Sequence, residues 1–232
     1  MPEIMIITGT SKGIGRHLVE YYMSCGYTVV GCSRSPMENP PIGYTHFCLD
    51  VSNEDEVQDM VQETYRQKGD IGYLINNAGI ASMNHFMLTP MKTVQKLFST
   101  NVYGTFLFCR EVAKVMSRKK KGRIVNFATI ATPIKLEGEA SYAASKAAVE
   151  SYTRVMAREL SNFNITVNAV GPTPVATDLI RGVPEEKIQN LLKMQAIPRL
   201  GEMKDITNVI DFFIQPGSDF ITGQVLYLGG VS

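Results

Sequence analysis

The chain has 232 residues, of which 44% are hydrophobic and 19% charged, and its formal net charge is +1. This composition is typical of a globular domain, and the near-neutral charge argues against a general role in binding nucleic acids or acidic membrane surfaces. The length fits one domain of the open α/β kind, and no apolar run approaches the length of a membrane-spanning helix.

Four cysteines and three histidines are scattered along the chain, and the cysteines form no Cys-x-x-Cys pair. This spacing argues against disulfide bonds and against a zinc site. The sequence starts with Met-Pro and enters an apolar run at once, so we expect neither a signal peptide nor a transit segment. The expected location is the cytoplasm, and no metal ion is expected.

Residues 4–32 predict a βαβ unit that binds a dinucleotide. An apolar strand over residues 4–8 leads into glycines spaced G-x-x-x-G-x-G, then into a helical pattern and a second strand over residues 27–32. Glycine lets the backbone turn sharply beside a pyrophosphate, and the helix N-terminus supplies free N–H groups and a positive dipole end. Without the flanking strands, an ordinary loop would be an equally good interpretation of the turn. The turn residues expected to contact the cofactor are Gly9, Ser11, Lys12, Gly13, Ile14 and Gly15.

The end of the second strand indicates which nicotinamide cofactor is bound. An NAD site usually carries an acid here for the ribose hydroxyls, whereas the 2′-phosphate of NADP requires a cation. This chain has Ser33-Arg34 and no acid, and Lys12 adds a second positive group in the glycine turn. We therefore expect NADP(H), with an ordinary surface arginine as the alternative interpretation of Arg34.

Strands and helices continue to alternate along the chain. Further strands are predicted over residues 44–49, 72–75, 122–127, 165–170 and 224–228, and helices over residues 52–68 and about 91–117. Seven strands with intervening helices predict a Rossmann-type α/β fold, a doubly wound parallel sheet with helices on both faces. We expect a single domain over residues 1–232.

Tyr142 and Lys146 stand four positions apart, so in a helix the phenol and the ammonium share one face. A cation about 4 Å from a phenol favours the phenolate by roughly 4 kcal/mol at an effective dielectric of about 20, or about three pKa units. The pair could then exchange a proton near neutral pH. Many surface helices carry the same spacing, so the pair indicates catalysis only together with the other motifs.

In their types and order, the motifs resemble those of the short-chain dehydrogenase/reductase family over almost the whole chain. The most similar branch comprises the β-ketoacyl-acyl carrier protein reductases and related NADPH-dependent carbonyl reductases. The motifs that carry the resemblance are Thr8-Gly9-x-x-x-Gly13-x-Gly15, Asp50-Val51, Asn76-Asn77-Ala78-Gly79, Asn101, Tyr142-x-x-x-Lys146 and residues 168–177.

The resemblance implies roles for individual residues. Tyr142 would protonate the carbonyl oxygen, while Lys146 would hold the nicotinamide ribose and lower the pKa of the phenol. Asn101 would bind a water that links Lys146 to solvent, with an ordinary polar helix residue as the alternative. The other cofactor contacts implied are Asp50 and Val51 at the adenine, Asn77, Ala78 and Gly79 beside the adenosine ribose, and Pro172, Thr173, Val175 and Thr177 around the carboxamide.

Two positions in the expected site depart from the family's pattern. The second catalytic hydroxyl, usually a serine thirteen residues before the tyrosine, is Thr129, which keeps the O–H but adds a methyl group. We expect catalysis to be retained, with a weakened enzyme or a non-catalytic cofactor-binding protein as the alternative. Thr173 replaces a glycine that usually follows the first proline of its loop, and Pro174 stiffens that loop.

The substrate cleft of such a sheet lies beyond the carboxyl ends of the strands. Three segments should wall it, residues 80–89, 130–139 and the substrate loop and helix over about 176–200, with Pro184 at the helix start. An apolar stripe in the last segment either packs internally or closes as a lid over an apolar substrate. The stripe comprises Ile188, Leu191, Leu192 and Met194, and the charged residues that could face either substrate or solvent are Lys135, Glu137, Glu139 and Arg181.

We therefore expect an NADPH-dependent enzyme that reduces a ketone or aldehyde to an alcohol, with a small-molecule substrate and the physiological direction left open. The alternative is a regulatory or partner-binding protein that binds NADP(H) without catalysis. The joint presence of Asn101, Tyr142 and Lys146 argues against it, because a binding module needs no proton relay. The resemblance also implies a homotetramer or dimer, assembled through the long helices and the terminal strand.

Overall fold

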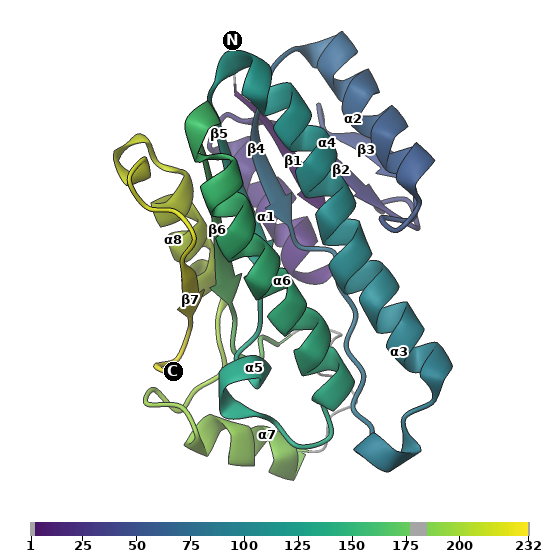
Figure 1. Cartoon of the computed structure of the whole chain (residues 1–232), viewed down its shortest axis with the longest axis vertical. Helices are drawn as coiled ribbons and strands as arrows, with labels where there is room; N and C mark the ends of the chain where they lie inside the picture. Colours follow the sequence, from purple (N-terminus) through teal and green to yellow (C-terminus); the bar gives the residue numbers. More distant parts are fainter. Residues whose placement is uncertain (1–2, 177–184, 232) are drawn as a thin grey trace.

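The computed structural model describes residues 3–176 and 185–231, and seven strands of this part form one parallel sheet (Figure 1). The strands are β1 (Ile4–Thr8), β2 (Thr28–Ser33), β3 (Thr45–Cys48), β4 (Ile71–Asn76), β5 (Gly122–Phe127), β6 (Ile165–Gly171) and β7 (Val225–Tyr227). Their order across the sheet is β3-β2-β1-β4-β5-β6-β7. Successive strands are added towards one side of the sheet up to β3 and towards the other side from β4 onwards, and doubly wound sheets open a crevice for ligands at this border of β1 and β4.

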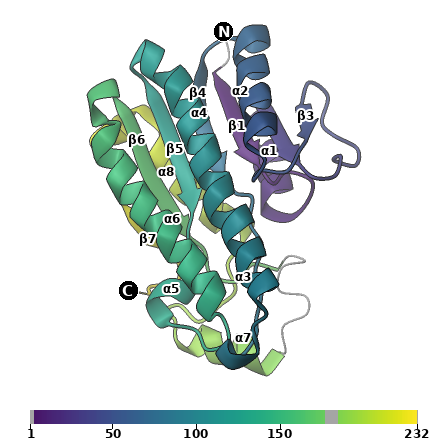
Figure 2. The same ribbon diagram turned by 45° about the vertical axis from the view of Figure 1, so that its right-hand side comes forward.

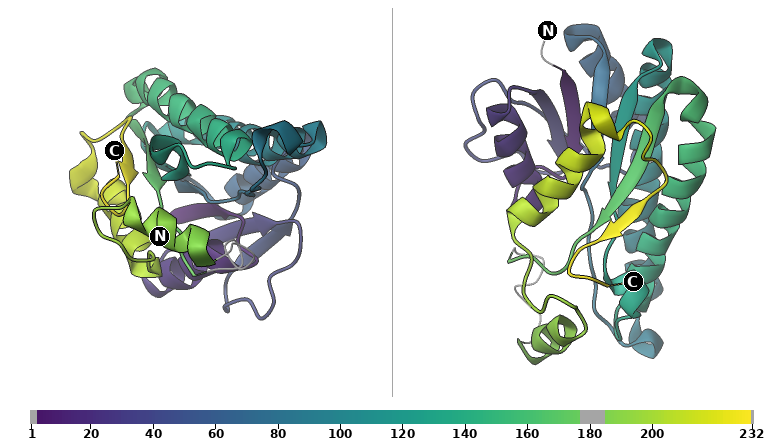
Figure 3. Two further views of the ribbon diagram at one scale, coloured as in Figure 1. Left: turned by 90° about the horizontal axis from the view of Figure 1, so that it is seen from below. Right: turned by 90° about the vertical axis from the view of Figure 1, so that its left-hand side faces the viewer.

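Helices cover both faces of the sheet (Figure 3). The helices are α1 (Gly13–Ser24), α2 (Glu54–Lys68), α3 (Met91–Phe98), α4 (Gly104–Lys119), α5 (Ala131–Ile134), α6 (Ala140–Glu159), α7 (Glu185–Lys193) and α8 (Met203–Ile214), with short 3₁₀ turns η1 (Phe86–Leu88), η3 (Ser161–Phe163) and η4 (Pro216–Ser218). One apolar cluster joins the sheet to α2, α4 and α6, and another joins it to α1 and α8. Ile6 and Ile7 of β1 point into opposite clusters, since side chains alternate along a strand.

The predicted fold is confirmed, and every predicted strand lies within one residue of its observed ends. Residues 4–8 and 122–127 have the predicted bounds, and the strand predicted over 72–75 extends over Ile71–Asn76. The helix predicted from residue 52 begins at Glu54 instead. Asn53 caps it, because its side chain accepts a hydrogen bond from the Glu56 N–H.

The helix predicted over about residues 91–117 is present, but one of its turns is π-helical, which the prediction did not include. α3 ends at Phe98, a π-helical turn η2 (Ser99–Tyr103) follows, and α4 begins at Gly104. A Cβ atom on Gly104 would lie 2.6 Å from Cγ2 of Val51, so this close approach requires glycine. Periodicity does not detect one widened turn between two regular helices, and such turns frequently occur at functional sites.

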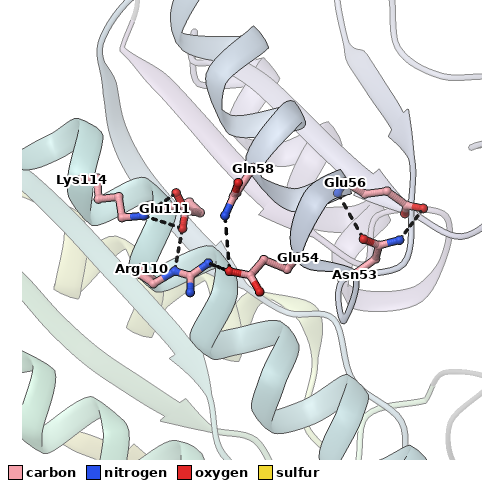
Figure 4. A network of polar contacts seen from close by, with 7 residues as sticks. All are labelled: Asn53, Glu54, Glu56, Gln58, Arg110, Glu111 and Lys114. Atoms are coloured by element: carbon pink, nitrogen blue, oxygen red, sulfur yellow. Dashed lines mark hydrogen bonds and ion pairs between the residues drawn. The ribbon is translucent and has the colours of Figure 1, made fainter.

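A network of ion pairs joins α2 to α4 (Figure 4). Arg110 donates to Glu54 Oε1 at 2.6 Å and to Glu111 Oε1 at 2.6 Å, and Lys114 Nζ lies 2.9 Å from the same Glu111 oxygen. The Glu111 side chain is only 7% exposed, and its two cationic partners compensate for that burial. Because Glu54 is largely exposed, solvent screens its pair with Arg110. The network adds to the apolar cluster that packs α2 against α4.

The carboxyl ends of the strands face α5 and α7, which Figure 2 shows beyond that edge of the sheet together with the start of α6. The sheet thus presents its ligand-binding edge to the start of α6, which carries Tyr142 and Lys146. None of the helices in the described residues combines the length and the apolar character that crossing a membrane requires.

Candidate active site

A cavity of about 650 Å³ lies at the carboxyl ends of β1, β2, β4, β5 and β6, and its lining includes nearly every residue that the sequence predicted for the site. Asn101 is not part of the lining, and Thr177 lies outside the described residues. The predicted residues that line the cavity are Gly9, Ser11, Lys12, Gly13, Ile14, Gly15, Ser33, Arg34, Asp50, Val51, Asn77, Ala78, Gly79, Thr129, Tyr142, Lys146, Pro172, Thr173 and Val175.

The turn after β1 has a backbone that requires glycine. The φ angle is +74° at Gly9 and +58° at Gly13, a region that other residues adopt only with strain. A Cβ atom on Gly15 would lie 2.1 Å from the Gly9 carbonyl oxygen. The N-terminus of α1 follows directly and forms part of the cavity lining, so its free N–H groups can receive phosphate oxygens.

Asn77, which follows β4, holds this turn against the neighbouring strand. Its side-chain amide donates to the Thr8 carbonyl at 2.9 Å and to the Gly9 carbonyl at 3.1 Å. The Ala78 N–H donates to Thr8 Oγ1 at 3.0 Å. Asn77 therefore fixes the crevice between β1 and β4, a structural role additional to the cofactor contact predicted for it.

A hydrogen-bond network lies beside the residues that follow β2. The Tyr44 hydroxyl donates to Thr10 Oγ1 at 2.6 Å and lies 2.9 Å from His46 Nδ1, and His46 Nε2 lies 3.2 Å from Ser33 Oγ. Burial lowers the pKa of His46, which keeps the imidazole neutral at pH 7. Sequence reasoning considered His46 only as a metal ligand and missed this network. The available signal was the spacing of Tyr44 and His46, two residues apart on one side of an extended segment.

Tyr142 lies in the first turn of α6 and is only 9% exposed. Burial raises the pKa of Tyr142 to about 12, against a hydrogen bond with the Thr129 side chain that lowers it, while the Glu139 charge raises it further. The prediction that Lys146 shifts this pKa towards neutrality is therefore wrong in this structure, because loss of hydration dominates. The phenol keeps its proton at neutral pH, which makes it a proton donor.

Lys146 is held between β5 and the turn that follows β4. Its Nζ atom donates to the Phe127 carbonyl at 2.8 Å, and a Cβ atom on Gly79 would lie 3.4 Å from Nζ. Burial lowers the pKa of Lys146 to about 8. An ammonium with this pKa is still mostly charged at pH 7, and it is fixed at the base of the cavity.

Asn101 is fully buried in the π-helical turn, where hydrogen bonds satisfy its side chain. Its amide accepts from the Ile80 N–H at 2.9 Å and donates to the Ile80 carbonyl at 2.9 Å and to Ser145 Oγ at 3.0 Å. The sequence did not identify Ser145, although it stands three residues after Tyr142 on the same helix face. Asn101 thus fixes the backbone after Gly79, and its role in a proton relay stays a prediction.

The apolar stripe of α7 packs against the wall of the cavity. Leu191 and Leu192 belong to one buried cluster with Ile130, and Leu191 also lines the cavity. Met194 is 51% exposed and does not belong to this cluster. Of the two interpretations of the stripe, internal packing therefore applies to most of its residues, while Leu191 also lines the cavity.

Of the charged residues that the sequence left open between substrate and solvent, the described structure places Glu139 in the cavity lining. Lys135 and Glu137 are exposed, and Arg181 and Pro184 lie outside the described residues. Burial raises the pKa of Glu139 to about 7. Among the described residues, no group of three or more His, Cys, Asp or Glu side chains is placed to bind a metal ion.

The loop after β6 accommodates the threonine that replaces the family's usual glycine. The Gly201 N–H donates to the Pro174 carbonyl at 2.9 Å, and a Cβ atom on Gly201 would lie 2.8 Å from Cγ2 of Thr173. Glycine at position 201 thus makes room for the threonine. The Thr173 hydroxyl is buried and has no hydrogen-bond partner within the described ranges, so it can bond to a ligand such as a carboxamide.

Comparison with known proteins gives consistent matches. A family model described as enoyl-(acyl carrier protein) reductase matches residues 9–231. The 3-oxoacyl-(acyl-carrier-protein) reductase FabG of Staphylococcus epidermidis is 31% identical over 99% of this chain and 98% of its own, and that of Escherichia coli is 28% identical over 98% and 96%.

Two solved structures have the same fold. Ligand-free aldohexose dehydrogenase of Thermoplasma acidophilum has a TM-score of 0.91 and 27% identity, covering 99% of this chain and 93% of its own. ElxO with NADP bound has a TM-score of 0.90 and 26% identity, covering 98% and 97%. These matches confirm the oxidoreductase class and the fold predicted from the motifs. The chain belongs to the short-chain dehydrogenase/reductase family.

Proposed function

We propose that this protein uses NADPH to reduce a ketone or an aldehyde to an alcohol. The observation that carries the proposal is the convergence of the Tyr142 phenol, the Thr129 hydroxyl and the Lys146 ammonium on one cavity. The same cavity contains the glycine turn and Arg34. It therefore offers a dinucleotide site and a proton donor together, which a purely structural cleft does not require.

NADP(H) fits the residues that line this cavity. Gly9 and Gly15 leave no space for side chains where the backbone must approach a pyrophosphate, and the partnerless Thr173 hydroxyl suits the nicotinamide carboxamide. Ser33 and Arg34 line the region where an acid would repel a 2′-phosphate. The similarity to ElxO, a protein solved with NADP bound, supports the same cofactor.

The chain's own residues would manage the proton and the developing charge. The nicotinamide ring supplies a hydride to the carbonyl carbon. Tyr142, whose raised pKa keeps it protonated at pH 7, donates its proton to the carbonyl oxygen. Thr129 Oγ1 accepts the Ala131 N–H at 3.2 Å, and its own proton, which bonds the Tyr142 oxygen in this structure, would turn to the same carbonyl oxygen when the substrate binds.

Lys146 and Asn101 would support that transfer from behind the phenol. A buried ammonium stabilises the phenolate that remains once the proton has left, because attraction between charges is strong where water is excluded. Asn101 holds the turn at Ile80 and the Ser145 hydroxyl next to Lys146. We propose that this arrangement returns a proton to Tyr142 after each turnover.

Absorbance of NADPH, followed with a panel of carbonyl compounds, tests the proposal. The names of the relatives give different substrates, a 3-oxoacyl-acyl carrier protein and an aldohexose. The panel therefore includes β-ketoacyl thioesters, sugars with a free carbonyl group, diketones and quinones. NADPH oxidation with formation of an equal amount of alcohol supports a reductase. Tight NADPH binding without turnover of any member contradicts it and favours the non-catalytic cofactor-binding protein.

We further propose that the protein forms a homo-oligomer. Tyr103 of η2, Phe106 of α4, and Tyr152 and Val155 of α6 are 57%, 36%, 38% and 50% exposed. Figure 2 shows α4 and α6 side by side on one face, and exposed apolar side chains on such a face favour association. Light scattering should give a dimer or tetramer that Val155→Glu dissociates.

We also propose that the protein is located in the cytoplasm, and its four free cysteines support this location.

A further inference from the structure

Glu139 occupies a fixed position at the entrance to α6. Its N–H donates to the Leu136 carbonyl at 3.2 Å, and its carbonyl accepts the Ala143 N–H at 2.7 Å. It stands three residues before Tyr142, so the two side chains project from adjacent positions on one side of the helix start. Both side chains line the cavity. The carboxyl group therefore lies near the place where the reacting carbonyl must meet the phenol.

The Glu139 carboxyl group is partly buried and has no partner among the described residues. It precedes α6 but does not cap the helix, and it makes no hydrogen bond or ion pair with another described side chain. The parts of the 130–139 and 176–200 segments that line the cavity with Glu139 include Leu136, Ala131 and Leu191, whose side chains offer no donor. A carboxyl group that lines a cavity without a protein partner is hydrated until a ligand displaces the water, so it is free to accept a hydrogen bond from a bound molecule.

The other titratable groups at this end of the cavity cannot take that place. The Tyr142 hydroxyl is hydrogen-bonded to the Thr129 side chain, and Lys146 Nζ donates to the Phe127 carbonyl. The described part of α7 contributes Leu191 to the lining. Once a ligand has displaced water from this end of the cavity, a donor for Glu139 has to come with that ligand.

We propose that Glu139 determines substrate specificity by accepting a hydrogen bond from a hydroxyl or ammonium group that the substrate carries close to its reacting carbonyl. This inference rests on the proposed function and deepens it, because it specifies the substrate class as hydroxylated or amino carbonyl compounds. A hydrogen bond to a carboxylate contributes about 1.5–3 kcal/mol, or roughly 10- to 100-fold in kcat/KM. A substrate with a methyl group in place of the donor leaves the carboxylate desolvated and unpaired, and is rejected by that factor.

The test compares hydroxyacetone and aminoacetone with butanone, in which a methyl group replaces the donor. In the wild-type enzyme, kcat/KM should favour a donor-bearing ketone over butanone by roughly 10- to 100-fold. In Glu139→Met, which keeps the side-chain length without an acceptor oxygen, this ratio should fall to near one because the donor-bearing ketone loses activity. Glu137→Met, which alters an exposed acid two residues away, is the matched control and should keep the wild-type ratio.

Glu139→Gln identifies the donor. An amide oxygen still accepts from a hydroxyl but no longer pairs with an ammonium, so selective loss of aminoacetone activity identifies an amino substrate, and retention of hydroxyacetone activity identifies a hydroxylated one. NADPH affinity and the thermal unfolding temperature should match those of the wild type in both variants, which separates specificity from misfolding.

Two results contradict this assignment, and they differ from failure of the proposed function. If Glu139→Met turns over all three ketones with the wild-type ratio, or loses activity towards all of them equally, Glu139 does not set specificity. If the wild-type enzyme oxidises NADPH with none of the carbonyl panel, the reductase itself is refuted and the assignment to Glu139 falls with it.

Discussion

The two ends of the cavity are built in different ways. At the end that receives the dinucleotide, the binding surface is formed mainly by the backbone of consecutive residues, such as Gly9 and Gly13 with their positive φ angles. At the catalytic end, side chains from separate segments meet away from water. Burial there raises the pKa of Tyr142 to about 12 and lowers the pKa of Lys146 to about 8. A short sequence motif can specify the first end, whereas the second depends on tertiary packing.

This difference predicts how substitutions will divide between kinetic constants. Changes at the dinucleotide end should alter the affinity for NADPH and the choice between NADPH and NADH. Changes at the catalytic end should alter kcat, since they act on charge that develops only in the transition state. A substitution at one end that alters the kinetic constant assigned to the other end would show that the two ends are coupled.

The largest effect is expected for Tyr142→Phe. Loss of a positioned proton donor should lower kcat by at least about 10²-fold, with little change in NADPH affinity. Steady-state kinetics with the best carbonyl of the panel checks the first effect, and fluorescence titration with NADPH checks the second. Tyr152→Phe, at an exposed position of the same helix, is the control and should retain activity. Near-normal turnover of the Tyr142 variant would remove the residue from the mechanism.

Thr129→Ala should lower kcat by about 10²-fold, because a hydrogen bond to the developing oxyanion is lost. Thr129→Ser restores the hydroxyl without the methyl group and should keep or increase activity. Thr132→Ala, which removes another buried hydroxyl near the start of α5, should leave kcat unaffected. Equal activity of the Thr129→Ala variant and the wild type would show that Tyr142 alone stabilises the oxygen.

Arg34→Asp should reverse the cofactor preference, because a carboxylate repels the 2′-phosphate and accepts hydrogen bonds from the ribose hydroxyls. A charge-assisted hydrogen bond contributes about 1.5–3 kcal/mol, so the ratio of kcat/KM for NADPH and NADH should shift by roughly 10- to 100-fold or more. Arg66→Asp on α2 controls for the change in net charge. An unchanged ratio would mean that Arg34 is an ordinary surface arginine.

The pH dependence of kcat/KM should report Lys146. Because burial lowers its pKa to about 8, the free enzyme carries the ammonium below that pH and loses it above. If the ammonium form is required, kcat/KM should fall by up to about tenfold per pH unit above about 8. Tyr142, with a pKa of about 12, stays protonated over this range and does not mask the decline. A flat profile through pH 8 would show that the charge of Lys146 is not required.

Sequence patterns predicted the strands and nearly all of the cavity lining, because glycine turns and strand ends depend on local residues. The sequence patterns did not predict features that depend on the surrounding tertiary structure. Asn101 lies in a π-helical turn that the period of the helix does not reveal. The pKa of Tyr142 is raised, whereas the sequence analysis predicted that it is lowered. That prediction included the nearby charge of Lys146 but not the loss of hydration on burial. Glu139 could not be assigned to the cavity or to solvent until the backbone before α6 was placed.

The smallest effect is expected for Tyr44→Phe, which tests whether the network beside Ser33 supports cofactor binding. The variant removes the hydroxyl that bonds Thr10 Oγ1 at 2.6 Å and lies 2.9 Å from His46 Nδ1. One neutral hydrogen bond contributes about 1 kcal/mol, so NADPH affinity should fall by about fivefold at most, with kcat at saturating NADPH nearly unchanged. Tyr65→Phe, on α2 away from the cavity, should leave the affinity unaltered. A loss of kcat with unaltered affinity would instead show that the dinucleotide end controls the geometry of the catalytic end.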